Sequence, residues 1–261
     1  MNTTLADKWI LITGASSGFG AAAALAFAKQ GARLLLGARR LDRLEKVSAQ
    51  ARAAGSPEAH LQVLDVASTD SVNAFVAWAK TRTQRVDILL NNAGGAHGVD
   101  TVAEGKDADW EAMFQSNVLG LLRVTRAVLP LMPRDAGASI INLGSIAGHT
   151  AYEGGSAYCG AKGAELQITR ALRLELNGTG IRVSTLDPGL AETEFSLVRF
   201  KGDAARAAKV YEGVIALTAE DIAETILWIA TRPAHVNIDE LIIKPTDQAA
   251  IHKVFRRPVQ K

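Results

Sequence analysis

The segment Trp9-Ile-Leu-Ile-Thr-Gly-Ala-Ser-Ser-Gly-Phe-Gly20 joins a short apolar run to a glycine-rich turn, and an alanine-rich helical pattern follows it. Glycine lets the backbone turn sharply and approach a phosphate closely, because no Cβ atom intrudes. The N-terminus of the following helix offers free N–H groups and a partial positive charge to an anion. Three glycines could also serve only a tight turn, but their place at the start of a βαβ unit favours dinucleotide binding. The residues expected to bind the dinucleotide are Gly14, Ser16, Ser17, Gly18, Phe19 and Gly20.

Short apolar runs alternate with longer helical patterns along the rest of the chain, which is typical of a parallel sheet covered on both faces. The expected strands are Trp9–Thr13, Arg33–Gly37, Leu61–Leu64, Ile88–Asn91, Ser139–Leu143, Ile181–Leu186 and Leu241–Ile243. The expected helices span residues 19–30, 41–54, 69–83, 107–131, 156–177 and 219–231. We predict one α/β domain over residues 1–261, a Rossmann-type doubly wound parallel sheet of about seven strands with helices on both faces. Residues 189–212 show no obvious strand or strong helix, and we expect them to form a substrate lid.

Composition and charge restrict the possible functions. The 261 residues include 29 Lys and Arg against 27 Asp and Glu, so the formal net charge is +2, which argues against nucleic acid or an anionic membrane as the main partner. The single cysteine, Cys159, allows no internal disulfide, and we expect it to be a packing residue rather than a nucleophile. The apolar runs are shorter than a membrane span, and the N-terminus lacks a signal-peptide pattern. We therefore expect a cytoplasmic protein, and we predict no metal site.

The end of the second expected strand indicates which dinucleotide is bound. A site that prefers NAD commonly has an acidic residue about 20 residues after the glycines, where it binds the ribose 2′-hydroxyl. Here that region contains Arg39 and Arg40, and the first carboxylate is Asp42. Arginine would attract the 2′-phosphate of NADP, whereas two solvated cations at the start of a helix would be electrostatically disfavoured. The pair therefore predicts NADP.

Three further residues form a candidate catalytic group. Tyr158 and Lys162 are four residues apart on an expected helix, so their side chains share one face. Ser145 follows the strand that precedes this helix. A Tyr-x-x-x-Lys spacing alone is common on solvated helix faces, but its combination with the glycine-rich turn is much more specific.

With these residues taken together, the chain resembles the short-chain dehydrogenases/reductases over nearly its whole length. The matching motifs are Thr13–Gly20, Asn91-Asn-Ala-Gly94, Asn117, Ser145, Tyr158-Cys-Gly-Ala-Lys162, and Pro188-Gly189 followed by Thr193. The segments 193–202, 216–221 and 232–238 are similar to the NADP-dependent 3-hydroxy acid dehydrogenases, which act on serine, allo-threonine and 3-hydroxypropionate. Phe19 departs from the aliphatic residue of many relatives, and this change does not threaten the turn.

The resemblance implies a role for each matched residue. Lys162 would act with Tyr158 and Ser145 and would also hold the nicotinamide ribose. Asn117 would hold a water in a proton relay; the alternative for Asn117 is a buried side chain satisfied by the backbone. The other implied cofactor contacts are Asp65 and Val66 at the adenine, Asn91, Ala93 and Gly94 at the ribose, Thr193 near the carboxamide, and Pro188 and Gly189. The resemblance also implies a homotetramer that packs through the helices near 107–131 and 156–177.

The chemistry of the side chains supports the same catalytic residues. Oxidation of an alcohol needs a base for its proton and an acceptor for its hydride, and reduction reverses both steps. A tyrosine has an ordinary pKa of about 10, which is too high for an efficient base at neutral pH. We expect the Lys162 cation to favour the phenolate form of Tyr158, and Ser145 to hydrogen-bond the reacting oxygen.

We expect the substrate to be selected by the lid. Arg199 and Lys201 lie there among apolar residues, and cations in such a setting suit a small anionic substrate. We predict that Arg199 is the anion anchor and Lys201 a second cation in the substrate site, although both could be surface cations on a loop. Tyr152 is a further predicted substrate contact, and His149 and His97 could also shape the pocket.

Two functions of one class and one of another class agree with these patterns. The leading hypothesis is an NADP-dependent oxidoreductase that interconverts a small 3-hydroxy acid and its carbonyl form. An NADPH-dependent reductase of sulfoacetaldehyde or another small aldehyde or ketone is the alternative within this class. The alternative from another class is a non-catalytic NADP-sensing regulator. Such a regulator would be expected to lose at least one of Ser145, Tyr158 and Lys162, and this sequence keeps all three.

Overall fold

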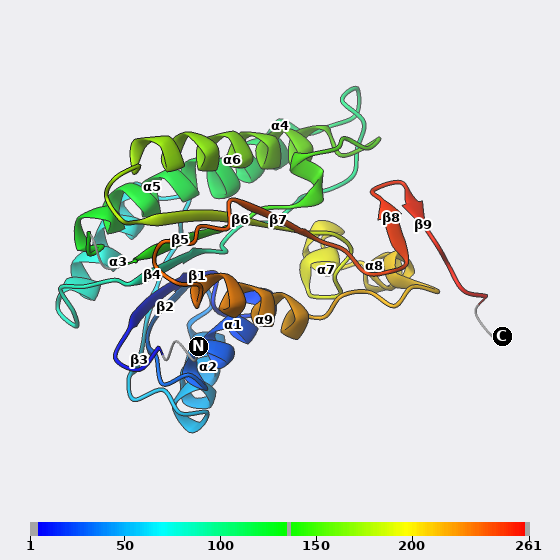
Figure 1. The fold of residues 1–261 in the computed structure, drawn as a ribbon. Coiled ribbons are helices and arrows are strands. Elements are labelled where there is room, and N and C mark those ends of the chain that lie inside the picture. The colour runs from blue at the N-terminus through cyan, green and yellow to red at the C-terminus, as the bar shows by residue number, and fades with distance from the viewer. Residues whose placement is uncertain (1–4, 135–136, 259–261) are drawn as a thin grey trace.

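Seven parallel strands form the central sheet of the computed structural model, which describes residues 5–134 and 137–258 (Figure 1). The strands are β1 (Trp9–Thr13), β2 (Arg33–Ala38), β3 (Ala59–Val63), β4 (Ile88–Asn91), β5 (Ser139–Leu143), β6 (Arg182–Pro188) and β7 (Glu240–Ile243). Their order in the sheet is β3-β2-β1-β4-β5-β6-β7. The chain first adds strands on one side of β1 and then crosses over to add β4 and later strands on the other side, so the strand order reverses between β1 and β4. Open sheets of this kind bind ligands at that reversal, beyond the carboxyl ends of the strands. The predicted fold class is confirmed, with strand ends shifted by one or two residues.

Helices cover both faces of the sheet (Figure 1). The helices α1 (Gly18–Ala28), α2 (Leu41–Ala53) and α9 (Ala219–Ala230) lie on one face, and α3 (Thr69–Lys80), α4 (Asp107–Phe114), α5 (Gly120–Val128) and α6 (Ser156–Glu175) lie on the other. Successive strand side chains point to opposite faces. Ile10 and Ile12 of β1 therefore join the core beneath α1, whereas Leu11 joins the core beneath α3 and α5.

The helix expected over residues 107–131 is interrupted. A π-helical turn, η1 (Gln115–Leu119), separates α4 from α5, and a 3₁₀ turn, η2 (Leu129–Leu131), follows α5. π-turns insert an extra residue into a helix and often occur at functional sites. Here the turn contains Asn117, whose amide group bonds the loop after β4. Apolar periodicity alone did not show this interruption, because the flanking residues keep a helical pattern on both sides.

The segment after β6 also differs from expectation. It contains two short helices, α7 (Phe195–Arg199) and α8 (Ala204–Tyr211), although no strong helix was expected between residues 189 and 212. Lys201 and Gly202 have φ values of +54° and +94°, which end α7, and the Asp203 side chain caps α8 by accepting from Arg206 N. A hairpin of β8 (Gln248–Ala250) and β9 (Lys253–Val254) was not predicted either. In the described part of the chain, no helix is both long enough and apolar enough to cross a membrane.

Candidate active site

A cavity of about 420 Å³ lies beyond the carboxyl ends of the strands, at the point where the strand order reverses. The turns after β1, β2, β3, β4 and β5 all contribute to its wall, together with α6 and the segment that follows β6. The cavity therefore collects residues that are far apart in the sequence. Its position is that of the dinucleotide site expected from the glycine-rich turn.

The glycine-rich turn has the conformation that a phosphate cradle needs. Gly14 and Gly18 have φ values of +65° and +52°, which favour glycine, and a Cβ on Gly14 would lie 2.8 Å from Asn92 Nδ2. Asn92 holds the turn by donating to the carbonyl oxygens of Thr13 and Gly14 at 2.9 and 3.1 Å. Ser17 is the N-cap residue of α1, but its side chain makes no capping bond, and no acidic residue lies in the first turn of α1. The positive end of this helix is therefore free to act on an anion in the cavity.

Arg39 and Arg40 both line the cavity, but they have different surroundings. Arg40 donates to Ser17 Oγ at 2.7 Å and to Glu194 Oε2 at 3.1 Å. Glu194 also accepts from Arg43 at 2.5 Å, and these two arginines, Arg43 first, hold the pKa of the Glu194 carboxyl below its usual range. Arg39 is exposed and has no ion-pair or hydrogen-bond partner among the described residues. The donor set therefore fits a phosphorylated ribose, with Arg39 as the available cation.

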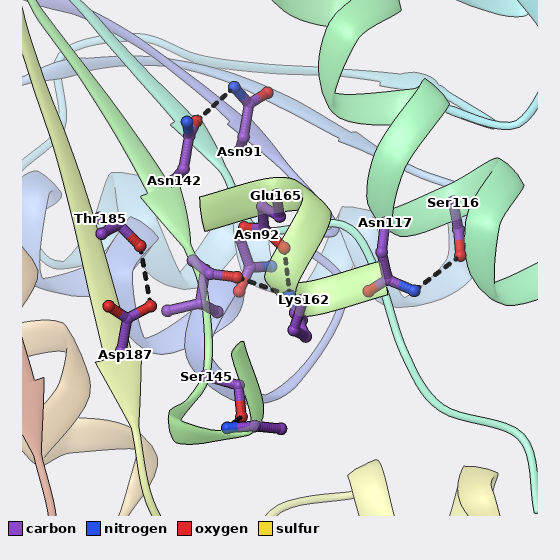
Figure 2. Close-up of polar contacts among 12 residues, drawn as sticks. Asn91, Asn92, Ser116, Asn117, Asn142, Ser145, Lys162, Glu165, Thr185 and Asp187 are labelled. Atoms are coloured by element: carbon purple, nitrogen blue, oxygen red, sulfur yellow. Dashed lines mark hydrogen bonds and ion pairs between the residues drawn. The ribbon is translucent and has the colours of Figure 1, made fainter. Parts of the chain in front are cut away.

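Most of the predicted cofactor residues line this cavity. They are Gly14, Ser16, Ser17, Gly18, Phe19, Arg39, Arg40, Asp65, Val66, Ala93, Gly94, Tyr158, Lys162 and Thr193. Four others do not line it, and packing explains each case. Gly20 lies against the Gly14 carbonyl, where a Cβ would come within 2.5 Å, and Gly189 packs against Gln248 and Lys244. Pro188 is buried at the end of β6, and Asn91 donates to Thr125 in the interior. Asn91 also donates to Asn142 (Figure 2).

Ser145 is oriented as a hydrogen-bond donor. It is the N-cap of the 3₁₀ turn η3 (Ile146–Gly148), and its Oγ accepts from Ala147 N at 3.1 Å (Figure 2). Because that bond uses an oxygen lone pair, the hydroxyl hydrogen remains available to another acceptor. The turn η3 packs against α6, where a Cβ on Gly148 would lie 2.8 Å from the Lys162 carbonyl oxygen. This packing brings the Ser145 turn beside the helix that carries Tyr158 and Lys162.

Tyr158 and Lys162 lie on α6 and line the cavity together, as the i, i+4 spacing predicts. Tyr158 is buried and packs against the Phe195 ring of α7, with the ring centroids 5.6 Å apart. Lys162 Nζ donates to the Leu143 carbonyl at 2.8 Å and to Glu165 Oε2 at 2.6 Å. Burial lowers the pKa of Lys162, but the negative charge of Glu165 and then Tyr158 raise that pKa by more than burial lowers it. The net shift is upward, and the lysine keeps its charge.

Asn117 is bonded to the backbone on both sides of its amide group. Its Oδ1 accepts from Gly95 N at 3.1 Å, and its Nδ2 donates to the carbonyl oxygens of Gly95 and Met113 at 2.9 and 2.7 Å. This is the arrangement of a buried asparagine satisfied by the backbone. The side chain therefore fixes the loop after β4, and its role in a proton relay stays a prediction.

Arg199 of α7 lies beside Tyr158, although it does not itself line the cavity. Its guanidinium carbon lies 5.4 Å from the centroid of the Tyr152 ring and 5.7 Å from that of the Tyr158 ring. Its Nε donates to the Gly98 carbonyl at 3.0 Å, whereas its Nη2 is buried without a hydrogen-bond partner. Burial raises the pKa of Tyr152, and both the charge of Arg199 and a side-chain hydrogen bond with Arg199 oppose that rise. A buried, unpaired guanidinium nitrogen beside Tyr158 is the feature expected of an anion anchor.

The other predicted substrate cation lies elsewhere. Lys201 Nζ forms an ion pair with Asp109 of α4 at 2.8 Å, its side chain is 55% exposed, and it does not line the cavity. It therefore links the segment after α7 to α4. His97 does line the cavity, but His149 does not, because its ring bonds the buried Asp187 carboxylate at 2.9 Å.

Sequence reasoning missed several residues of this site. Asn92, Gly144, Phe195 and Val198 line the cavity, and Asn92 was available in the same Asn-Asn-Ala-Gly motif that pointed to Asn91. Glu194 was missed because its arginine partners lie about 150 residues away in the sequence. The signal for Glu165 was present, since a Lys-x-x-Glu spacing places both side chains on one helix face. Within the described residues, no group of three or more His, Cys, Asp or Glu side chains could hold a metal ion.

Comparisons with known proteins agree with this geometry. The short chain dehydrogenase family model matches residues 8–203. A sulfoacetaldehyde reductase of Chromohalobacter salexigens is 47% identical over 241 residues, which cover 92% of this chain and 94% of that protein. An NADP-dependent 3-hydroxy acid dehydrogenase of Schizosaccharomyces pombe is 41% identical over 254 residues, with 97% and 98% of the two chains covered. The closed form of a serine dehydrogenase complexed with NADP⁺ superposes with a TM-score of 0.88 at 37% identity, with 96% and 100% of the two chains covered.

Proposed function

The chain belongs to the short-chain dehydrogenase family, and from this membership we propose that it is an NADP-dependent oxidoreductase that interconverts a small 3-hydroxy acid and its carbonyl form. The observation that carries the proposal is the buried, unpaired Nη2 of Arg199 beside Tyr158. It supports a substrate whose anionic group lies a short distance from the reacting carbon. Relatives named as 3-hydroxy acid and serine dehydrogenases support the same substrate class.

The proposed cofactor is NADP, and the cavity residues support it. Arg39, with Arg40 and the Ser16 and Ser17 hydroxyls, would hold the 2′-phosphate, and the N-terminus of α1 would face the pyrophosphate. Lys162 would hold the nicotinamide ribose. When bound, NADPH supplies the hydride that reduces the carbonyl carbon.

The chain's own residues would orient the carbonyl group and supply its proton. The Ser145 hydroxyl would donate its hydrogen to the carbonyl oxygen, since the bond from Ala147 N occupies only one of the two oxygen lone pairs and leaves that hydrogen free. Tyr158 would give its hydroxyl proton to that oxygen during reduction and accept it back during oxidation. The Lys162 charge, kept in the buried site, would favour the phenolate that remains. The lid around Phe195 would exclude water by packing on the Tyr158 ring.

Reduction of sulfoacetaldehyde is a second candidate function, and the 47% identity to a sulfoacetaldehyde reductase favours it. A guanidinium binds carboxylate and sulfonate oxygens by the same kind of charge-assisted bonds. Arg199 therefore supports an anion near the reacting carbon without distinguishing the two acids.

The experiment compares NADPH with NADH on malonic semialdehyde, sulfoacetaldehyde, serine, allo-threonine and a neutral aldehyde of similar size. We expect NADPH to be preferred and the acidic substrates to be turned over most efficiently. Arg199→Ala should lower kcat/KM for the acidic aldehydes about 10- to 100-fold more than for the neutral one, since it removes hydrogen bonds to a charged group. Arg206→Ala is the matched control, because Arg206 lies in the same segment but stacks on Phe200 rather than on Tyr152 and Tyr158.

Two results would contradict the proposal. Equal losses of kcat/KM on acidic and neutral aldehydes in Arg199→Ala would remove the anion anchor. Absence of turnover with every substrate, combined with NADPH binding, would favour the NADP-sensing regulator instead. A higher kcat/KM for sulfoacetaldehyde than for malonic semialdehyde would select the second candidate function.

We also propose that the chain is a homotetramer. Phe114, Leu119 and Leu122 of the α4–η1–α5 segment are 38–42% exposed, and Leu174 of α6 is 79% exposed, which supports contacts between copies through these helices. Light scattering coupled to gel filtration tests this assembly, and a monomeric mass would contradict it. A cytoplasmic location stays a prediction that cell fractionation would test.

A further inference from the structure

We propose that Glu165 is a positioning residue that acts through Lys162 and sets the pH at which Tyr158 gives up its proton. The inference deepens the proposed function and rests on it. Glu165 lies three residues after Lys162 on α6, so the two side chains share one helix face. Glu165 Oε2 is 2.6 Å from Lys162 Nζ, and the two side chains are turned toward each other (Figure 2). None of the motifs that identify the family includes Glu165.

The pair is buried, so its charges are poorly screened by water. Lys162 is 8% exposed and Glu165 is 2% exposed. Lys162 Nζ also donates to the Leu143 carbonyl at 2.8 Å. Two of the three ammonium hydrogens are therefore engaged by Leu143 and Glu165, and one remains for the cavity that Lys162 lines. Glu165 thus helps to fix both the position and the direction of the ammonium group.

The Glu165 carboxylate also opposes the electrostatic effect of Lys162. A cation near a phenol favours the phenolate, and a negative charge at hydrogen-bond distance from that cation cancels part of its field. Burial raises the pKa of Glu165 to about 7, with Lys162 opposing the rise and Asp187 adding to it. Glu165 is therefore ionised at any pH clearly above neutral. Under those conditions the Lys162–Glu165 pair acts on Tyr158 more weakly than a lysine alone would.

Other charged groups nearby leave Glu165 as the partner that controls Lys162. The ionisable groups on the elements packed against α6 include Asp187 and Arg182 on β6, Asp107, Asp109 and Glu111 on α4, and His149 after η3. Arg199 of α7 also faces α6, with its guanidinium carbon 5.7 Å from the Tyr158 ring centroid, and it stays unchanged in the Glu165 variants. Asp187 already accepts from Thr185 Oγ1 at 2.8 Å and bonds His149 at 2.9 Å. Asp109 is paired with Lys201. Glu165 is the carboxylate in direct contact with Lys162.

The test replaces Glu165 by glutamine and follows tyrosinate formation by ultraviolet difference absorbance against pH. The chain has three tyrosines, and burial raises the pKa of both Tyr152 and Tyr211, so their titration is displaced to high pH. Subtraction of a Tyr158→Phe titration isolates the Tyr158 step. We expect its midpoint to move by about one pH unit in Glu165→Gln. It falls where Lys162 keeps its charge, because the contacting carboxylate no longer opposes that charge. It rises where burial, no longer offset by Glu165, deprotonates Lys162. The acid limb of kcat/KM for alcohol oxidation should move in the same direction.

Glu175→Gln is the matched control, since Glu175 is an exposed glutamate on the same helix and should leave the midpoint unchanged. Glu165→Met serves as a second uncharged variant if the glutamine variant does not fold. In the wild-type chain, ¹³C-labelled glutamate should show one carboxyl that titrates near pH 7.

Each outcome decides the inference. A folded uncharged variant with the wild-type Tyr158 midpoint would overturn the inference. It would also be overturned if every labelled glutamate carboxyl of the wild-type chain titrated near the ordinary value of about 4.3. A shifted Tyr158 midpoint in a variant whose wild-type parent turns over no substrate would support the coupling of Glu165 to Tyr158 while rejecting the proposed function. The absorbance readout therefore separates the two failures.

Discussion

Arg39 and Arg40 are adjacent in the sequence, yet they differ in what they can offer a ligand. Arg40 is already engaged by Ser17 and Glu194, whereas Arg39 faces the cavity without a partner among the described residues. A phosphate would have to compete with the Glu194 carboxylate for Arg40 but not for Arg39. The preference for NADP over NAD should therefore depend more on Arg39.

We predict that Arg39→Ala lowers the ratio of kcat/KM with NADPH to that with NADH by about 10- to 100-fold, because one charge-assisted contact to the 2′-phosphate is lost. Steady-state kinetics with both cofactors measure this ratio. Arg82→Ala is the control, since Arg82 is exposed beyond the end of α3 and stacks on Trp78. If Arg39→Ala has the same NADPH-to-NADH ratio of kcat/KM as the wild type, then Arg40 or another group binds the 2′-phosphate.

Site residues whose arrangement depends on local sequence spacing were the easiest to find from the sequence. Tyr158 and Lys162 share a helix face because of their spacing alone, and the glycine-rich turn follows directly from its place after β1. Glu194 could not be found in this way, because its charge partners come from α2 and the preceding turn. Lys201 shows what a distant partner can add: a cation among apolar residues suggested substrate binding, and the fold places Asp109 2.8 Å from it, so that its substrate contact stays a prediction.

At the level of elements, the loop after β4 and the turn η1 hold each other in place. Asn117 pairs with both polar atoms of the Gly95 backbone, and a Cβ on Gly94 would collide with Asn117 Oδ1. The neighbouring Ala93 and Gly94 line the cavity, so the position of this loop sets part of the cofactor wall.

We predict that Gly94→Ala displaces the Asn117 amide and breaks its pairing with Gly95. Stability should fall by about 1–3 kcal/mol, because buried polar groups are left without partners, and kcat/KM should fall with it. Thermal unfolding and steady-state kinetics measure the two effects. Gly163→Ala is a matched glycine control, since its Cβ would meet only the Gly148 carbonyl at an ordinary 3.8 Å. Unchanged unfolding and activity in Gly94→Ala would show that the loop accommodates the extra methyl group.

The strands were predictable because most are buried on both faces, so that short apolar runs mark them directly. The interruption at η1 depends instead on a contact between Asn117 and a loop about 20 residues earlier, which no local pattern contains. The helix α8 did carry a local signal, since Asp203, an N-cap residue type, directly precedes the alanine-rich run of that helix. The hairpin of β8 and β9 is too short for periodicity to reveal.

Across the whole molecule, the carboxyl ends and the amino ends of the strands have separate roles. The carboxyl edge holds the cavity, whereas the amino edge holds a cluster of charges around Asp87. The Asp87 carboxylate accepts from the Trp9 backbone N–H at 3.0 Å, from Lys8 at 3.2 Å and from Arg85 at 2.7 Å. It therefore links the starts of β1 and β4, the two strands at which the sheet order reverses.

The pH dependence of stability should reflect this link. Burial alone would raise the pKa of Asp87, but hydrogen bonds from Arg85 and Trp9 and the charge of Lys8 hold it below its ordinary value. A carboxylate with a lowered pKa stabilises the fold fully above its ordinary value of about 3.9. That contribution is lost as the pH falls through the folded-state pKa.

We therefore predict that Asp87→Asn lowers the Tm by about 3–6 °C at pH 7, since weakened bonds to charged groups cost about 1–2 kcal/mol. The difference from wild type should persist at pH 5 and shrink as the pH falls below about 4 through the lowered pKa of the folded carboxyl, because only there is the wild-type carboxyl protonated as well. Calorimetry across this range measures both effects, with Asp7→Asn as the control, because Asp7 is 80% exposed in its pair with Arg33. The KM values for cofactor and substrate should stay at wild-type levels, since Asp87 lies at the edge opposite the cavity. A Tm difference that is constant with pH would mean that Asp87 stabilises the sheet by its shape and hydrogen bonding rather than by its charge.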